Sequence, residues 1–178
     1  MDTSALSVSE VKTLLGNNDV DPGLLSRLVG LFYPTDREIA THPRAQPETL
    51  EKLSHSNDAE TVRLIVQNPA TPPDILIRLA PEFPIDFFQN AILDMLILED
   101  PQLLRKLKPG VLRTFLKAED CPSSFVVWAS RHGTKGDQLE ILKREDVSID
   151  VLKAVANGSH PKTAERAIDQ LLELGEAW

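Results

Sequence analysis

A spacing of one proline and two leucines recurs along the chain and constrains its fold more than any other feature. It occurs at Pro73-Leu76-Leu79, Pro22-Leu25-Leu28, Pro47-Leu50-Leu53 and Pro101-Leu104-Leu107. Aromatic residues replace the leucines at Pro122-Phe125-Trp128, and isoleucine replaces the proline at Ile149-Leu152-Val155. The middle residues of these sets are 21 to 28 positions apart. A repeat of this length is typical of solenoids, in which each unit buries its apolar face by stacking on its neighbours.

Each repeat has the chemistry of a short helix. Proline suits the first helical position because its fixed φ is helical and its missing N–H has no partner to lose there. Apolar residues three and six positions later then share one helix face. A second apolar segment follows the anchors, as at 58–66 and 161–172. We therefore expect each unit to contain a short helix, a turn and a second helix, and we expect the anchors to be buried.

These patterns predict an all-α fold, an α-solenoid of short helical repeats. We expect one domain over residues 1–178, with about six repeats over 20–172 and a C-terminal tail at 173–178. A cap helix is expected over 1–16, because Ser7 and Glu10 have the spacing of a capping box.

Three stretches resemble the variant leucine-rich repeat of bacterial proteins: residues 39–53, 58–63 and 68–72. The resemblance implies units that combine an α-helix with a short 3₁₀ or second helix in a right-handed superhelix, similar to HEAT repeats. It concerns the fold and brings no catalytic motif. One described member of that family has a cysteine-rich iron–sulfur segment, but this chain has a single cysteine, so the resemblance implies no cluster here.

Charge and cysteine content limit the cellular compartments and the classes of binding partner to be expected. The net charge is −8 and the isoelectric point is about 5.0, which disfavours general binding to nucleic acids or membrane surfaces. Cys121 is the only cysteine, so no disulfide can form within the chain and a reducing compartment is expected. The first residues lack the pattern of a secretory signal, and no apolar run is long enough for a membrane span. We expect a cytoplasmic protein with no membrane contact.

Two stretches have more than one interpretation. Residues 81–98 are rich in aromatic and apolar side chains, and they are either buried within the chain or form a docking surface. Residues 105–117 carry basic side chains without an acidic one. They are either a strip that binds phosphate or an acidic partner, or a solvated face whose counter-charges come from neighbouring repeats. The basic residues are Arg105, Lys106, Lys108, Arg113 and Lys117.

Catalytic and metal-binding patterns are weak. No two histidines have the i, i+4 spacing of a helical zinc site. The acidic residues before Cys121 disfavour an activated thiol, and the loop 133–136 lacks the Walker pattern and is expected to be a connector. A glycosylase site of Trp128 with Asp137 or Asp150 conflicts with the acidic charge. We expect no enzyme activity, no cofactor and no metal.

The sequence thus predicts a non-catalytic scaffold or adaptor that binds another protein of unknown identity. Repeat arrays offer extended surfaces for such contacts. The alternative is a module that binds nucleic acid or phosphate through the basic strip 105–117. Side chains between the anchors are the candidate contacts, and we name Arg105, Lys108, Arg113 and Phe87.

Overall fold

The structure is a computed structural model that describes residues 6–108 and 110–176. Within these residues every regular element is a helix and no strand occurs, which confirms the all-α prediction. The elements are α1 (Val8–Leu15), α2 (Pro22–Leu28), α3 (Tyr33–Thr41), α4 (Pro47–Leu53), α5 (Ala59–Gln67), α6 (Pro73–Leu79), α7 (Pro84–Phe88), α8 (Leu93–Glu99), the 3₁₀ helix η2 (Leu103–Lys106), α9 (Val111–Leu116), α10 (Ser123–His132), α11 (Lys135–Ile141), α12 (Ile149–Ala156) and α13 (Pro161–Glu173).

The chain divides into two compact units, Met1–Leu93 and Asp94–Trp178. The boundary falls inside the segment 81–98, where the proline–leucine spacing is interrupted. Cooperative folding of 1–178 as one domain stays a prediction. In the described part of the chain, no helix is both long and apolar enough to cross a membrane.

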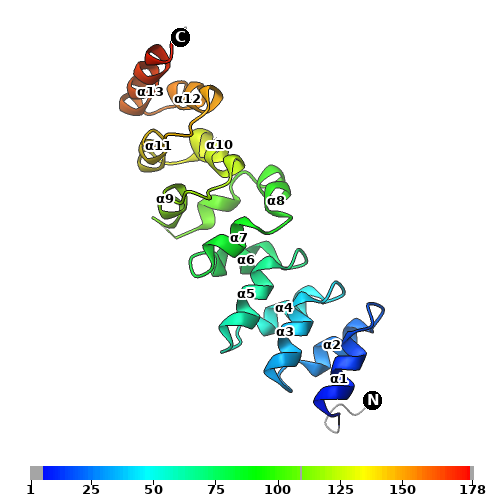
Figure 1. Cartoon of the computed structure of the whole chain (residues 1–178). Coiled ribbons are helices and arrows are strands. Elements are labelled where there is room, and N and C mark those ends of the chain that lie inside the picture. The colour runs from blue at the N-terminus through cyan, green and yellow to red at the C-terminus, as the bar shows by residue number, and fades with distance from the viewer. Residues whose placement is uncertain (1–5, 109, 177–178) are drawn as a thin grey trace. The chain divides into compact units, whose positions relative to one another are not determined.

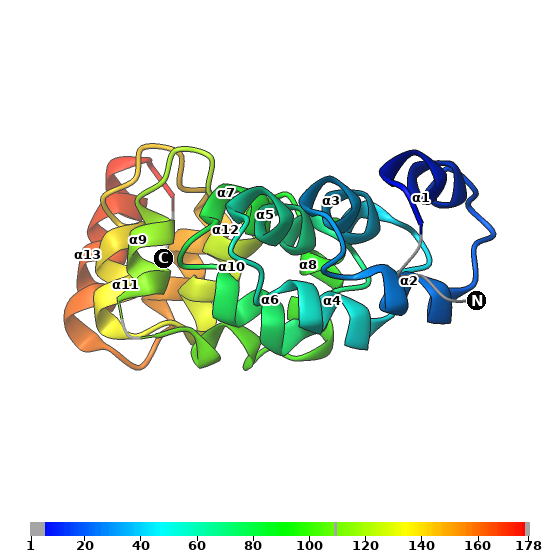
Figure 2. The same cartoon turned by 90° about the horizontal axis from the view of Figure 1, so that it is seen from below.

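In the first unit the helices form two rows (Figures 1 and 2). Helices α1, α3, α5 and α7 contact one another in succession in one row. Helices α2 and α4 contact each other in the other row, which α6 continues (Figure 2). Contacts between the rows join α2 to α3, α4 to α5 and α5 to α6.

The second unit has the same alternation. Helix α11 contacts both α9 and α13, and α10 contacts α12 (Figure 1). The closest association of two helices in this unit is between α12 and α13, which share a core of Leu142, Leu152, Val155, Ala156, Ala167 and Leu171. Helices α9, α11 and α13 thus form one row of this unit, and α10 and α12 form the other.

Three of the anchor helices begin with proline, as the repeat predicts. Proline stands in the first turn of α2, α4 and α6, and a capping box of Ser7 and Glu10 starts α1. Two units differ, because Pro122 is the N-cap of α10 and Pro101 precedes a 3₁₀ helix rather than an α-helix. Residues 1–5 of the predicted cap helix and residues 177–178 of the predicted tail lie outside the described part of the chain.

All of the predicted anchor side chains are buried. None is more than 7% exposed, and the largest value belongs to Leu107. The prediction that the repeat marks the core is confirmed. The anchors are Leu25, Leu28, Leu50, Leu53, Leu76, Leu79, Leu104, Leu107, Phe125, Trp128, Leu152 and Val155.

Buried polar side chains also connect consecutive repeats. Asn68, at the C-cap of α5, donates its side-chain N–H to the Ala40 carbonyl at 2.6 Å. Asn90, just after α7, donates to the Val66 carbonyl at 2.6 Å. The ring Nε2 of His42, at the C-cap of α3, lies 3.4 Å from the Asn17 carbonyl. These pairs are separated by 24 to 28 residues, which is the period of the repeat.

The segment 81–98 was expected either to be buried within the chain or to form a docking surface, and as a whole it does neither. Leu93 and Ile97 are buried, whereas Ile85, Met95 and Leu98 are at least half exposed. Phe87, expected to be an exposed contact residue, is instead fully buried. The reason is that it follows Pro84 by three residues in α7, which is the spacing of an inward-facing anchor.

Candidate binding site

The second unit contains a pocket of about 550 Å³ that gathers basic side chains from four consecutive elements. It lies among η2, α9, the C-terminal end of α10 and the start of α11, and His160 before α13 also lines it. Its apolar wall is formed by Leu104, Leu107, Leu112 and Trp128. We call it the basic pocket.

The charges of the basic pocket oppose those of the whole chain. Its cationic side chains are Arg105, Lys108, Arg113 and Lys135, and its one lining carboxylate is Asp137. With the histidines neutral, this is a formal excess of three positive charges on a protein whose net charge is −8. Clustered charges of one sign in a concave site strengthen the local field, so the pocket favours an anionic ligand.

Two of the four cations are free to meet a ligand. Arg105 donates from Nη2 to the His132 carbonyl at 3.1 Å, and Nε of Arg113 lies 3.9 Å from Oδ1 of Asp137. Among residues 6–108 and 110–176, neither Lys108 nor Lys135 has an ion-pair partner, and both are exposed. Binding an anion there would break no existing ion pair.

The carboxylate in the pocket already has local partners. Asp137 accepts hydrogen bonds from the backbone N–H of Thr134 at 2.8 Å and from its hydroxyl at 2.6 Å. The backbone N–H of Asp137 donates in turn to the Thr134 hydroxyl, so the pair is a capping box that starts α11. Asp137 therefore stabilises the start of α11, the helix that presents Lys135.

A glycine leaves room for one of the arginines. A methyl group at Gly136 would collide with the guanidinium of Arg113, so Gly136 allows this side chain to lie against the first turn of α11. The residue is helical, and its backbone does not require glycine. Its role here is to accommodate Arg113.

A rigid aromatic side chain forms the wall beside these charges. Trp128 is 4% exposed, and its indole N–H donates to the carbonyl of Pro101. The ring of His132 lies 5.5 Å from the indole ring, centroid to centroid. The hydrogen bond to Pro101 thus fixes the position of the indole in this wall.

The structure places the predicted residues as follows. Arg105, Lys108 and Arg113 line the same pocket. Of the remaining strip residues, Lys106 pairs with Asp100 at 3.0 Å and Lys117 lies at a different cavity. Phe87 is buried and does not line the basic pocket.

Lys135 and the histidines of the pocket were not among the predicted contacts. The connector expected over 133–136 is shorter in the structure: only Gly133 and Thr134 separate α10 from α11, and Lys135, which lines the pocket, is the first residue of α11. The repeat period could have indicated that these regions lie together. Arg105 and His132 are 27 residues apart, which is about one period, and Arg105 donates a hydrogen bond to the His132 carbonyl.

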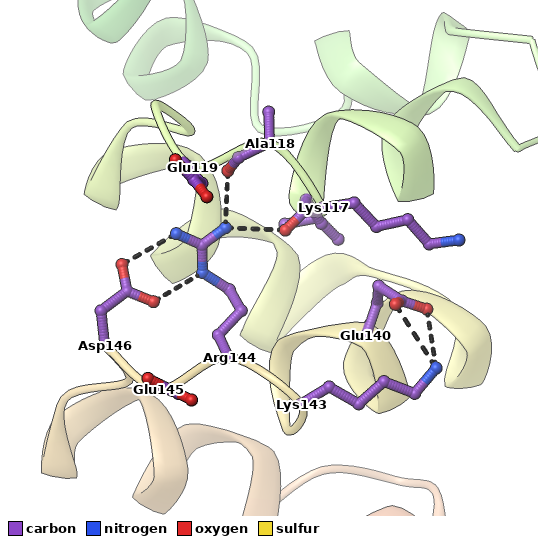
Figure 3. Close-up of a pocket in the computed structure, with 9 residues that line it drawn as sticks. Lys117, Ala118, Glu119, Glu140, Lys143, Arg144, Glu145 and Asp146 are labelled. Atoms are coloured by element: carbon purple, nitrogen blue, oxygen red, sulfur yellow. Dashed lines mark hydrogen bonds and ion pairs between the residues drawn. The ribbon is translucent and has the colours of Figure 1, made fainter.

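A second cavity of about 410 Å³ lies at the other end of α9 (Figure 3). Arg144 donates from Nη1 to the carbonyls of Leu116 and Ala118, at 2.7 and 3.0 Å, and forms two 2.8 Å hydrogen bonds with Asp146. Lys143 pairs with Glu140 at 3.2 Å. Lys143 and Arg144 are thus both paired, and Arg144 joins the end of α9 to the segment that follows α11.

Cys121 is buried and poorly suited to nucleophilic chemistry. Burial raises the pKa of its thiol to about 11, with Arg144 acting in the opposite direction and Asp146 adding to the increase. A thiol with this pKa is protonated at neutral pH. In the described part of the chain, no group of three or more His, Cys, Asp or Glu side chains could hold a metal ion.

Comparisons with family models, with curated proteins and with solved structures found no match in any of the three.

Proposed function

We propose that this chain is a non-catalytic helical-repeat protein that binds another protein through the basic pocket. In this proposal the repeats are stacked as a right-handed solenoid of the variant leucine-rich or HEAT-like type. The protein acts in the cytoplasm as a scaffold or adaptor.

The stacked arrangement is supported by the register of the contacts within each unit. Anchor leucines are buried at each repeat, and side-chain hydrogen bonds join residues 24 to 28 positions apart, including Arg78 to Ser54, Trp128 to Pro101 and Gln170 to Leu142. A fold in which every unit contacts the next one requires contacts at one repeat period.

Binding at the basic pocket is supported above all by its charge. Four cations, from η2, the connection between η2 and α9, α9 and α11, line one cavity of a strongly acidic chain, and two of them have no ion-pair partner in the described residues. Such a cluster raises the energy of the unbound protein by mutual repulsion, and an anionic partner relieves it. The non-catalytic part of the proposal is supported by the hydrogen-bonded Asp137 and the protonated Cys121 thiol.

Affinity capture from a lysate of the native cells tests this proposal. The bait is the whole chain, compared with the charge-reversed variant Lys108→Glu/Lys135→Glu. The control Lys117→Glu/Arg166→Glu makes the same charge change at exposed positions outside the pocket. We expect a protein that the wild type and the control retain and that the pocket variant loses. Equal recovery on all three baits would exclude the pocket as the binding site.

Binding of nucleic acid or free phosphate is the second candidate, because the same four cations could contact phosphate groups. The chain's charge of −8 opposes it, and the indole ring of Trp128, which lines the pocket, is buried and cannot stack on bases. A labelled oligonucleotide titrated at low and moderate salt separates the candidates, since phosphate contacts give a steep loss of affinity with salt. Absence of binding at low salt removes this candidate.

A further inference from the structure

A smaller, mainly apolar pocket of about 290 Å³ adjoins the basic pocket in the second unit. Ile97, Leu98, Pro101 and Val127 contribute its apolar surface, and Leu98 is 81% exposed. Its lining charges, Asp94 and Arg131, are of opposite sign. We call it the apolar pocket. Its neutral balance and its exposed leucine suit an apolar side chain rather than an ion.

The two pockets share a wall. Trp128 and His132 line both, and both belong to α10. The indole is fixed by its hydrogen bond to Pro101, which itself lines the apolar pocket. One extended ligand lying along α10 can therefore reach cations on one side of the Trp128–His132 wall and an apolar surface on the other.

We propose that this two-part groove binds an acidic segment of a partner protein that also carries a large apolar side chain. Its carboxylates occupy the basic pocket and its apolar side chain occupies the apolar pocket. The inference rests on the proposed function and specifies the chemistry of the partner. The acidic character of the partner segment is inferred from charge complementarity, because the basic pocket has an excess of three positive charges.

Carboxylates fit the basic pocket better than a phosphate group does. Phosphate recognition commonly uses an arginine fork that donates two parallel hydrogen bonds. Here Arg105 already donates to a carbonyl and Arg113 lies beside Asp137 and Gly136. The cations without an ion-pair partner in the described residues are Lys108, in the connection between η2 and α9, and Lys135, in α11, and they act as separate point charges. Separate charges suit several carboxylates along a peptide.

Selection from a display library of random peptides about twelve residues long tests the ligand chemistry. The target is the whole wild-type chain, and the library is counter-selected on Lys108→Glu/Lys135→Glu. We expect enriched peptides to combine Asp or Glu residues with a Leu, Ile, Phe or Trp. Enrichment without an excess of acidic residues would overturn the inference, while leaving a protein-binding function in place. Failure to enrich any peptide would also overturn it, and affinity capture would then decide the proposed function separately.

Fluorescence anisotropy with the most enriched peptide then tests both halves of the groove. We expect Lys108→Glu/Lys135→Glu to weaken binding at least about tenfold, and Leu98→Ala to weaken it about threefold to tenfold. Leu98 is exposed, so its replacement leaves the fold intact. The control Lys117→Glu/Arg166→Glu is expected to bind within about twofold of the wild type.

Competition decides between carboxylate and phosphate ligands. Inorganic phosphate and a single-stranded oligonucleotide of the same formal charge as the peptide are added to the preformed complex. We expect neither to displace the peptide at equimolar concentration. Displacement by either, or unchanged peptide binding in Leu98→Ala, would contradict an acidic segment with an apolar side chain as the occupant.

Discussion

At the scale of single residues, the anchors carry the packing. Leu76 is 1% exposed and belongs to α6, the last helix of the first unit's second row. Replacing it with alanine removes buried methyl groups and leaves a cavity, so Leu76→Ala is expected to cost about 2–5 kcal/mol of unfolding free energy. Urea unfolding measures this difference. Leu98→Ala is the matched control, because Leu98 is 81% exposed, and its cost should stay below about 1 kcal/mol. An equally small loss for Leu76→Ala would show that the anchor is not in the core.

An exposed ion pair gives a prediction about pH. Asp58 accepts two 2.7 Å hydrogen bonds from Arg37, and this contact, followed by the hydrogen bond from the Thr61 side chain, holds the pKa of Asp58 well below its usual 3.8. A lowered pKa in the folded state contributes stability above the unfolded value, and the contribution is lost as pH falls below it.

Asp58→Asn removes the charge but keeps a residue that can cap α5. We expect this variant to be less stable than the wild type at about pH 6, with a smaller difference at about pH 3. Denaturant midpoints at the two pH values measure it. The control Asp169→Asn, at an exposed carboxylate without an ion-pair partner among the described residues, should show no such trend. A difference that grows on acidification would refute the role given to Arg37.

At the scale of elements, buried amides join one repeat to the next. Asn68 is 6% exposed and donates to the Ala40 carbonyl, while its own side-chain oxygen accepts from the Ala70 N–H at 2.8 Å. Asn68→Ala leaves both backbone groups without this partner, so we expect a loss of about 1–3 kcal/mol in unfolding free energy. Asn57→Ala, at an exposed asparagine of the first unit, serves as control. Equal stability of the two variants would mean that the bond between repeats contributes nothing.

A substitution at the start of α11 is expected to affect ligand binding and protein stability differently. In Gly136→Ala the new methyl group displaces the guanidinium of Arg113, whereas alanine is the better residue in a helix by about 0.5–1 kcal/mol. We therefore expect unchanged or slightly higher thermal stability together with weaker binding of the acidic peptide. Calorimetric melting and anisotropy measure the two effects. Wild-type affinity in this variant would show that the position of Arg113 does not matter to the ligand.

At the scale of the whole molecule, the sequence predicts features that depend on neighbouring residues. It does not predict which residues far apart in the sequence come into contact. The helix starts and the buried faces follow from proline and leucine spacings within seven residues, and the sequence predicts them correctly at α2, α4 and α6. Asn68 and His42 were not expected to connect repeats, because a buried asparagine or histidine before proline looks locally like a turn residue.

The part of the candidate site that lies within one short stretch of the sequence was predictable, and the part that depends on tertiary contacts was not. Arg105, Lys108 and Arg113 lie within nine positions of one another, so their common charge is visible in the sequence. Lys135 reaches them only because α11 packs beside α9, which is a tertiary contact. Phe87 was misplaced because residues 81–98 break the repeat, which hid the anchor spacing from Pro84.

The central claim is that the basic pocket binds an acidic segment of another protein. Its most direct test is amide chemical-shift mapping of the whole ¹⁵N-labelled chain, titrated with the acidic peptide enriched by selection. The account predicts saturable shifts concentrated at residues 104–113 and 128–137, with further shifts at 97–98 and 160 and little change in the first unit. Shifts scattered over both units, or confined to residues outside the two pockets, would contradict it.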